Sequence, residues 1–163
     1  MGISSHLPSP QFSLEGELTS WAKDTIHQYE KRAGELTTEV RHLDEQAHTL
    51  QQLLDAVKSA MATKGVVNLN DPAIAPLIHT LKEGGLDIPV PPDGMLTKQT
   101  AADWLKIVDD DRHQIANRIQ RLQSEIPLAL GHLKETLAII LKILQQIHEI
   151  IMMILHNMAS HAK

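Results

Sequence analysis

The residues with the potential for chemistry are mainly histidines and aspartates, and their spacing argues against a metal site. His148 and Glu149 resemble the start of a zinc-protease motif, but Met152 stands where that motif needs its second histidine. None of the ten histidines lies three or four residues from another. Asp109, Asp110 and Asp111 are consecutive, and consecutive helix residues point in different directions. We therefore expect solvated side chains and no metal.

Other catalytic and ligand-binding signatures are missing from the chain. It has no phosphate-binding glycine loop, no G-x-S-x-G nucleophile motif and no calcium loop. It has no cysteine, which excludes disulfides and thiol nucleophiles. With 15 Lys and Arg against 20 Asp and Glu, the net charge of −5 argues against nucleic-acid binding. We expect no enzyme activity, no cofactor and no small-molecule substrate.

The elements around these residues are predicted to be helices. Of all residues 42% are apolar, yet the only aromatic ones are Phe12, Trp21, Tyr29 and Trp104. Apolar residues then alternate at spacings of four and three from Ala22 to Met61, which is the heptad pattern of a coiled coil. This pattern predicts a first long helix over residues 14–64, with Gly34 as a weak point. The predicted seam is Ile26, Tyr29, Leu36, Val40, Leu43, Leu50, Leu54 and Val57.

A compact insertion is predicted over residues 65–96, where proline and glycine are frequent. A short helix should begin at Asp71–Pro72, run through Leu81 and stop at Gly84–Gly85. The segments 66–69 and 86–90 are candidates for a minor β-hairpin, followed by a turn at 91–94. We expect Trp104, which opens the next helix, to anchor onto the short helix.

A second long helix is predicted over residues 97–160. It should start near Thr97 or Thr100, with Thr100 and Asp103 at capping-box spacing, and kink near Pro127. Its last third is apolar on two faces, although five polar residues within 137–155 argue against an independent membrane span. We expect one face to pack on the first helix and the other to mediate self-assembly. The inner face is Ile140, Leu144, Ile147, Ile151 and Ile154; the outer face is Ile139, Ile143, Ile150 and Met153.

Together these elements predict an all-α fold, a long antiparallel helical hairpin (coiled coil) with a small central insertion. The layout resembles the needle-tip and EspA-like filament proteins of bacterial type III secretion systems. Two stretches carry the resemblance: GELTTEVRHLDEQAHTLQQLLDAVKSAM (34–61) and PPDGMLTKQTAADWLKIVDDDRHQIANRI (91–119). The resemblance implies a helical shaft whose C-terminal helix drives self-assembly into a filament or a needle-tip complex.

The resemblance also implies partners and a location. These would be further copies of the chain, the secretion needle, the translocator proteins and a cytoplasmic chaperone before export. Export to the bacterial surface would use an uncleaved N-terminal signal, for which residues 1–13, polar and predicted to be disordered, are the candidate. This chain lacks the extra N-terminal hairpin of many tip proteins, which favours a filament subunit. It also departs from the family in its C-terminal coil, because the family's coil is usually richer in Ser, Asn and Thr than residues 137–155.

A second function class stays open from the sequence. Because residues 137–155 are unusually apolar, the chain could instead be an intracellular helical adaptor or chaperone that binds an amphipathic partner helix.

Overall fold

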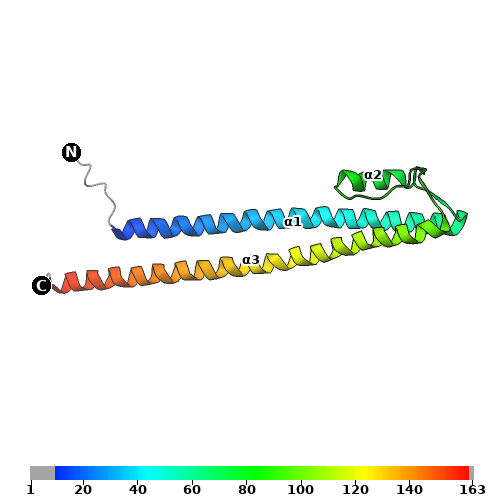
Figure 1. The fold of residues 1–163 in the computed structure, drawn as a ribbon. Helices are drawn as coiled ribbons and strands as arrows, with labels where there is room; N and C mark the ends of the chain where they lie inside the picture. The colour runs from blue at the N-terminus through cyan, green and yellow to red at the C-terminus, as the bar shows by residue number, and fades with distance from the viewer. Residues whose placement is uncertain (1–9, 162–163) are drawn as a thin grey trace, which may run out of the picture. The chain divides into compact units, whose positions relative to one another are not determined.

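The computed structural model describes residues 10–161, and their side chains from Leu14 onward. It contains helix α1 (Pro10–Lys64), strand β1 (Val67–Asn68), helix α2 (Ala75–Glu83), strand β2 (Met95–Leu96) and helix α3 (Lys98–His161) (Figure 1). Helices α1 and α3 have 55 and 64 residues. The predicted all-α class is confirmed. Of the predicted export signal, residues 1–9 lie outside the described residues, and residues 10–13 are helical where we expected disorder.

The chain divides into two compact units, to which α1 and α3 both contribute. Unit 1 combines residues up to Glu35 with those from Glu125 onward, and unit 2 is Leu36–Ser124. Each unit is described by itself below.

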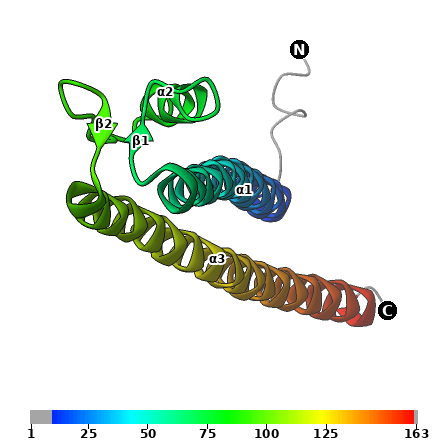
Figure 2. The ribbon, with the colours of Figure 1, turned by 90° about the vertical axis from the view of Figure 1, so that its right-hand side faces the viewer.

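In unit 2, α1 and α3 lie side by side and run in opposite directions (Figures 1 and 2). Arg118 Nε donates to Glu39 Oε1 at 3.0 Å, and Arg112 Nη1 donates to Gln51 Oε1 at 2.8 Å. The predicted seam is well packed here, because apolar side chains from both helices are removed from water. Of the predicted seam, Val40 is half-buried and the buried residues are Leu36, Leu43, Leu50, Leu54 and Val57. The buried apolar residues that α3 contributes are Ala101, Trp104, Val108, Ile115 and Leu122.

The insertion gives α1 a second buried side that the heptad pattern does not show. Helix α2 lies along α1 on the side away from α3 (Figure 2). Gln46 Nε2 donates to the carbonyl of Gly84 at 2.7 Å and ties α1 to the end of α2. Leu53, outside the predicted seam, is fully buried, as is Leu81 of α2.

Helix α2 starts later than the sequence predicts and stops where it predicts. Asp71 is not its N-cap: the carboxylate accepts a hydrogen bond from the Ala73 N–H at 2.9 Å and forms a turn before the helix begins. At the other end, the Leu86 N–H donates to the Leu81 carbonyl at 3.0 Å, which Gly85 permits by adopting a φ of +92°.

The strand pair forms with a different partner from the one predicted. Val67 pairs with Leu96 and Asn68 with Met95, antiparallel, so the pairing of 66–69 with 86–90 was wrong. Residues 86–90 instead pack inward through buried Ile88. The Pro89 carbonyl accepts the indole N–H of Trp104 at 2.7 Å. Trp104 thus makes its hydrogen bond to this segment rather than to α2.

Helix α3 begins at Lys98, directly after Thr97, the first of the two predicted starts, but its capping pair differs from the predicted one. The Thr97 N–H donates to Thr100 Oγ1 at 2.8 Å, and the Thr100 N–H donates to Thr97 Oγ1 at 3.3 Å. A Thr100–Asp103 capping box was therefore the wrong pair. Helix α3 continues through Pro127 without a break. A kink there stays a prediction.

Candidate assembly surface

Unit 1 pairs the first part of α1 with the last part of α3, and its packing is sparse. Arg32 Nη2 donates to Glu125 Oε2 at 2.8 Å, but both side chains are exposed, so this ion pair contributes little. Of the predicted seam residues in unit 1, Tyr29 is half-buried and Ile26 is 37% exposed. Among the described residues of unit 1, the buried apolar side chains are Leu18 and Ile140.

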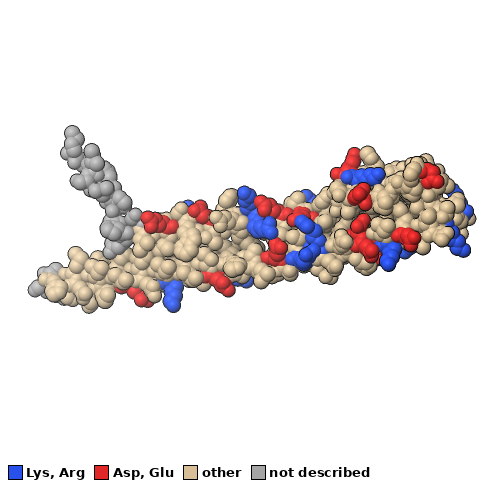
Figure 3. Space-filling model, viewed as in Figure 1, with Lys and Arg blue, Asp and Glu red and all other residues tan. Residues whose placement is uncertain are grey.

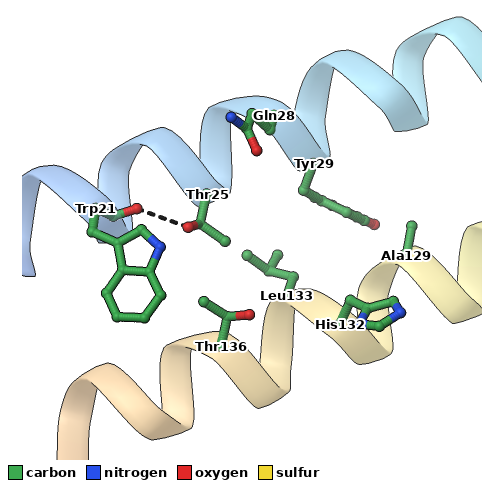
Figure 4. Close-up of a pocket in the computed structure, with 8 residues that line it drawn as sticks. All are labelled: Trp21, Thr25, Gln28, Tyr29, Ala129, His132, Leu133 and Thr136. Carbon is green, nitrogen blue, oxygen red and sulfur yellow. Dashed lines mark hydrogen bonds between the residues drawn. The ribbon is translucent and has the colours of Figure 1, made fainter. Parts of the chain in front are cut away.

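A pocket of about 440 Å³ separates the two helices of unit 1 where a tight coiled coil would interdigitate (Figure 4). Both small and large side chains line it: Thr25, Ala129 and Thr136 among the small ones, and Trp21, Tyr29 and Leu133 among the large ones. Thr25 Oγ1 donates to the carbonyl of Trp21 on its own helix at 2.8 Å. The pocket thus lowers the apolar contact that unit 1 makes with itself.

The antiparallel register of unit 1 shows that α3 extends beyond α1. Arg32 contacts Glu125, and Trp21, eleven residues earlier, lines the same pocket as Thr136, eleven residues later. One further step of eleven residues brings Pro10, the start of α1, level with Ile147. Residues 148–161 therefore extend roughly 21 Å past the described start of α1, at about 1.5 Å per residue. We call this segment the C-terminal overhang.

The predicted assembly residues divide between the two sides as follows. Of the expected outer face, Ile139, Ile150 and Met153 are exposed, whereas Ile143 is half-buried. Of the expected inner face, Ile140 is buried and Leu144, Ile147 and Ile151 are half-buried. Ile154 was expected to face α1 but is exposed, because it belongs to the overhang and lies beyond the described start of α1.

The exposed apolar surface is wider than one face. Eight large apolar side chains of α3 in this region are between 41% and 63% exposed: Ile139, Leu141, Ile150, Met152, Met153, Ile154, Leu155 and Met158. At about 100° per residue these positions surround the helix. Leu141, Met152 and Leu155 lie on the second apolar face that the sequence predicts, beside the four residues given for the outer face, whereas the spacing of Met158 had placed it in line with the inner face. The sequence does contain the signal, an apolar pattern on every side of the helix.

Formal charge is scarce on this surface. Within residues 148–161 Glu149 is the single Asp, Glu, Lys or Arg, accompanied by His148, His156 and His161. The space-filling view accordingly shows the end of α3 almost entirely in tan, with one small acidic patch at its lower edge (Figure 3). Such a surface lacks the charges that keep protein surfaces apart in water.

In the acidic cluster of unit 2 (Asp109, Asp110 and Asp111), the Asp109 carboxylate contacts two side chains of its own helix. Asp109 pairs with Arg112 at 2.8 Å and lies 3.3 Å from His113. Partial burial, and then the nearby carboxylates of Asp110 and Asp87, raise the pKa of Asp111 above its ordinary value. Within residues 10–161 no group of three or more His, Cys, Asp or Glu is placed to hold a metal ion.

Part of helix α3 is long and apolar enough, by length and composition, to cross a membrane. It contains an 18-residue stretch of mean hydropathy 1.7, of which 11% is buried. Length and composition alone give weak evidence for a span. The same stretch is what an assembly surface requires, since both need apolar side chains facing outward.

Comparisons with family models, with curated proteins and with solved structures found no match to this chain.

Proposed function

We propose that this chain is a secreted structural subunit that self-assembles through the C-terminal overhang and the adjoining exposed face of α3. The assembly would be an extracellular type III secretion filament, or a needle-tip complex that links the needle to the translocon. The observation that carries the proposal is the overhang itself, which is apolar on every side and exposed along nearly its whole length. Apolar patches of this kind mark protein interaction sites.

The size of the exposed surface indicates reversible assembly. Eight side chains that are about half exposed would contribute on the order of 1 kcal/mol each when covered, or on the order of 10 kcal/mol together. Association itself costs about 4–15 kcal/mol in lost freedom of motion. The two quantities are similar, so we expect assembly to depend on concentration. Contacts that do not close on themselves propagate as filaments.

The proposed shaft is a single antiparallel helical hairpin. Its support is that each unit, taken by itself, pairs α1 with α3: Arg32 meets Glu125 in unit 1, and Glu39 meets Arg118 in unit 2.

Partners and location follow from the same proposal. The needle, the translocator proteins and a cytoplasmic chaperone would contact the chain at different stages. It would be cytoplasmic before export and extracellular afterwards. The overhang supports a role for a chaperone, because such a surface has to be covered before assembly.

The assembly proposal is tested by one charge placed on the overhang. Ile150→Asp should abolish filaments in negative-stain electron microscopy, because burying a carboxylate without a partner costs several kcal/mol. Ile107→Asp is the matched control: Ile107, in unit 2, is 48% exposed and Ile150 is 51% exposed. Both variants should keep the helical circular-dichroism spectrum. Filaments that survive Ile150→Asp would contradict the proposal.

The export proposal is tested by deleting residues 2–9, which leaves α1 intact. Release into the medium should be lost while the thermal unfolding temperature stays the same. Normal release of the deletion variant would exclude this segment as the signal. A wild-type chain that is monomeric and binds an added amphipathic helix through residues 137–155 would instead favour the adaptor function.

A further inference from the structure

Three methionines of the C-terminal overhang form a distinct chemical group. Met152, Met153 and Met158 are 53%, 58% and 63% exposed. Met61 of unit 2 is half-buried and Met95 sits at 36% exposure in strand β2. The chain contains no cysteine, so no thiol competes with these thioethers for an oxidant.

Their spacing distributes the three sulfur atoms around the helix. At about 100° per residue, Met153 is turned about 100° from Met152, and Met158 about 240°. The three side chains thus divide the circumference of the overhang approximately into thirds. Whichever side of the overhang a neighbouring molecule covers, at least one methionine lies in the contact.

We infer that Met152, Met153 and Met158 are an oxidation site at which peroxide switches self-assembly off. The inference rests on the proposed function. In the reaction the thioether sulfur attacks one oxygen of hydrogen peroxide, the O–O bond breaks, and an S–O bond forms. Sulfur is oxidised by two electrons, and the proton on the transferred oxygen passes to the departing hydroxide, which leaves as water. The product, methionine sulfoxide, is polar and resists burial in an apolar contact.

Selectivity is measured first, by peptide mass spectrometry during treatment of the wild-type chain with hydrogen peroxide. Met152, Met153 and Met158 should each gain one oxygen atom several-fold faster than Met61. The oxidation rate of Met95 should lie between the rate of Met61 and those of the three overhang methionines. Protein that is already assembled should be protected at one or more of these three positions, because the contact covers at least one of them. Equal rates at Met61, Met95 and the three methionines of the overhang would overturn the site.

The switch is measured by sedimentation of the oxidised protein. The apparent association constant should fall at least tenfold, with the helical circular-dichroism spectrum unchanged, and methionine sulfoxide reductases should restore assembly. The triple variant Met152→Leu, Met153→Leu, Met158→Leu should assemble normally and resist peroxide. The control variant Met61→Leu, Met95→Leu should remain sensitive.

The outcomes separate this inference from the proposed function. Assembly that persists after complete oxidation of the three methionines, or a triple leucine variant that is as sensitive as wild type, would overturn the switch alone. An untreated chain that stays monomeric would contradict the proposed function and the switch together. The oxidation rates would then still decide whether the site exists.

Discussion

The two units are built from the same two helices, but they differ in how far they bury their apolar side chains. Unit 2 buries its seam and adds the insertion as a further layer, with Leu50, Leu53 and Val57 fully inaccessible. Unit 1 leaves a pocket between its helices and exposes most of its large apolar side chains. The difference indicates that unit 2 is stabilised by its own core, whereas unit 1 leaves apolar surface uncovered, which is the surface that the proposed assembly would use.

Truncating one leucine in each unit tests this difference in burial most strongly. Leu54→Ala in unit 2 should lower the free energy of unfolding by about 2–5 kcal/mol, because it leaves a cavity in a packed core. Leu155→Ala on the overhang should change the stability of the monomer by less than about 0.5 kcal/mol. Urea unfolding followed by circular dichroism at low protein concentration measures both. Equal losses would show that the overhang is packed within the monomer.

Substituting one glycine in each unit by alanine tests the backbone conformation of that unit. Gly94 in unit 2 has a φ of +70°, and a Cβ there would lie 2.4 Å from Asn70 Nδ2. Gly94→Ala should therefore cost about 1–2 kcal/mol, the penalty of the left-handed conformation, after the Asn70 amide moves aside. Gly131→Ala in α3 of unit 1 meets nothing within 4 Å and should stabilise the helix by about 0.5–1 kcal/mol. Thermal unfolding gives the two signs, and a destabilising Gly131→Ala would mean that its helix is not formed as described.

The smallest expected effect concerns the acidic cluster Asp109–Asp111 of α3 in unit 2. Because the pKa of Asp111 is raised by partial burial and by Asp110 and Asp87, its ionised form opposes folding. The stability that the protonated form provides is complete below the ordinary pKa of 3.8 and is lost as the pH rises through the folded pKa. Asp111→Asn should stabilise the fold at pH 7 by less than about 1 kcal/mol, since solvent screens the site, and the gain should vanish near pH 3. Asp24→Asn, at an exposed position of unit 1, controls for the loss of one charge. A gain for Asp111→Asn that does not change with pH would contradict this interpretation.

Much of unit 2 is predictable because its elements are periodic or carry strong stop signals. The heptad spacing locates Leu36, Leu50 and Leu54, and Gly84–Gly85 ends α2 as expected. The strand partner was missed because a two-residue strand has no periodicity. Leu53 was missed because a heptad describes only one buried strip, whereas the insertion creates a second one.

The assembly surface is only partly predictable for a different reason. An apolar pattern shows that residues near Ile150 avoid water, but which of them α1 covers depends on the register of the two helices and on where α1 begins. Ile154 illustrates this: its spacing matches the inner face, yet it lies past the level of Pro10. Neither the register nor the pocket near Trp21 is encoded in residue spacing alone.

The most direct test of the assembly surface is sedimentation velocity of the wild-type chain over a range of concentrations, in neutral buffer without lipid or detergent. The account predicts that the sedimentation coefficient rises with concentration and that Ile150→Asp remains monomeric over the same range. A wild-type chain that sediments as a single monomeric species at every concentration would contradict it.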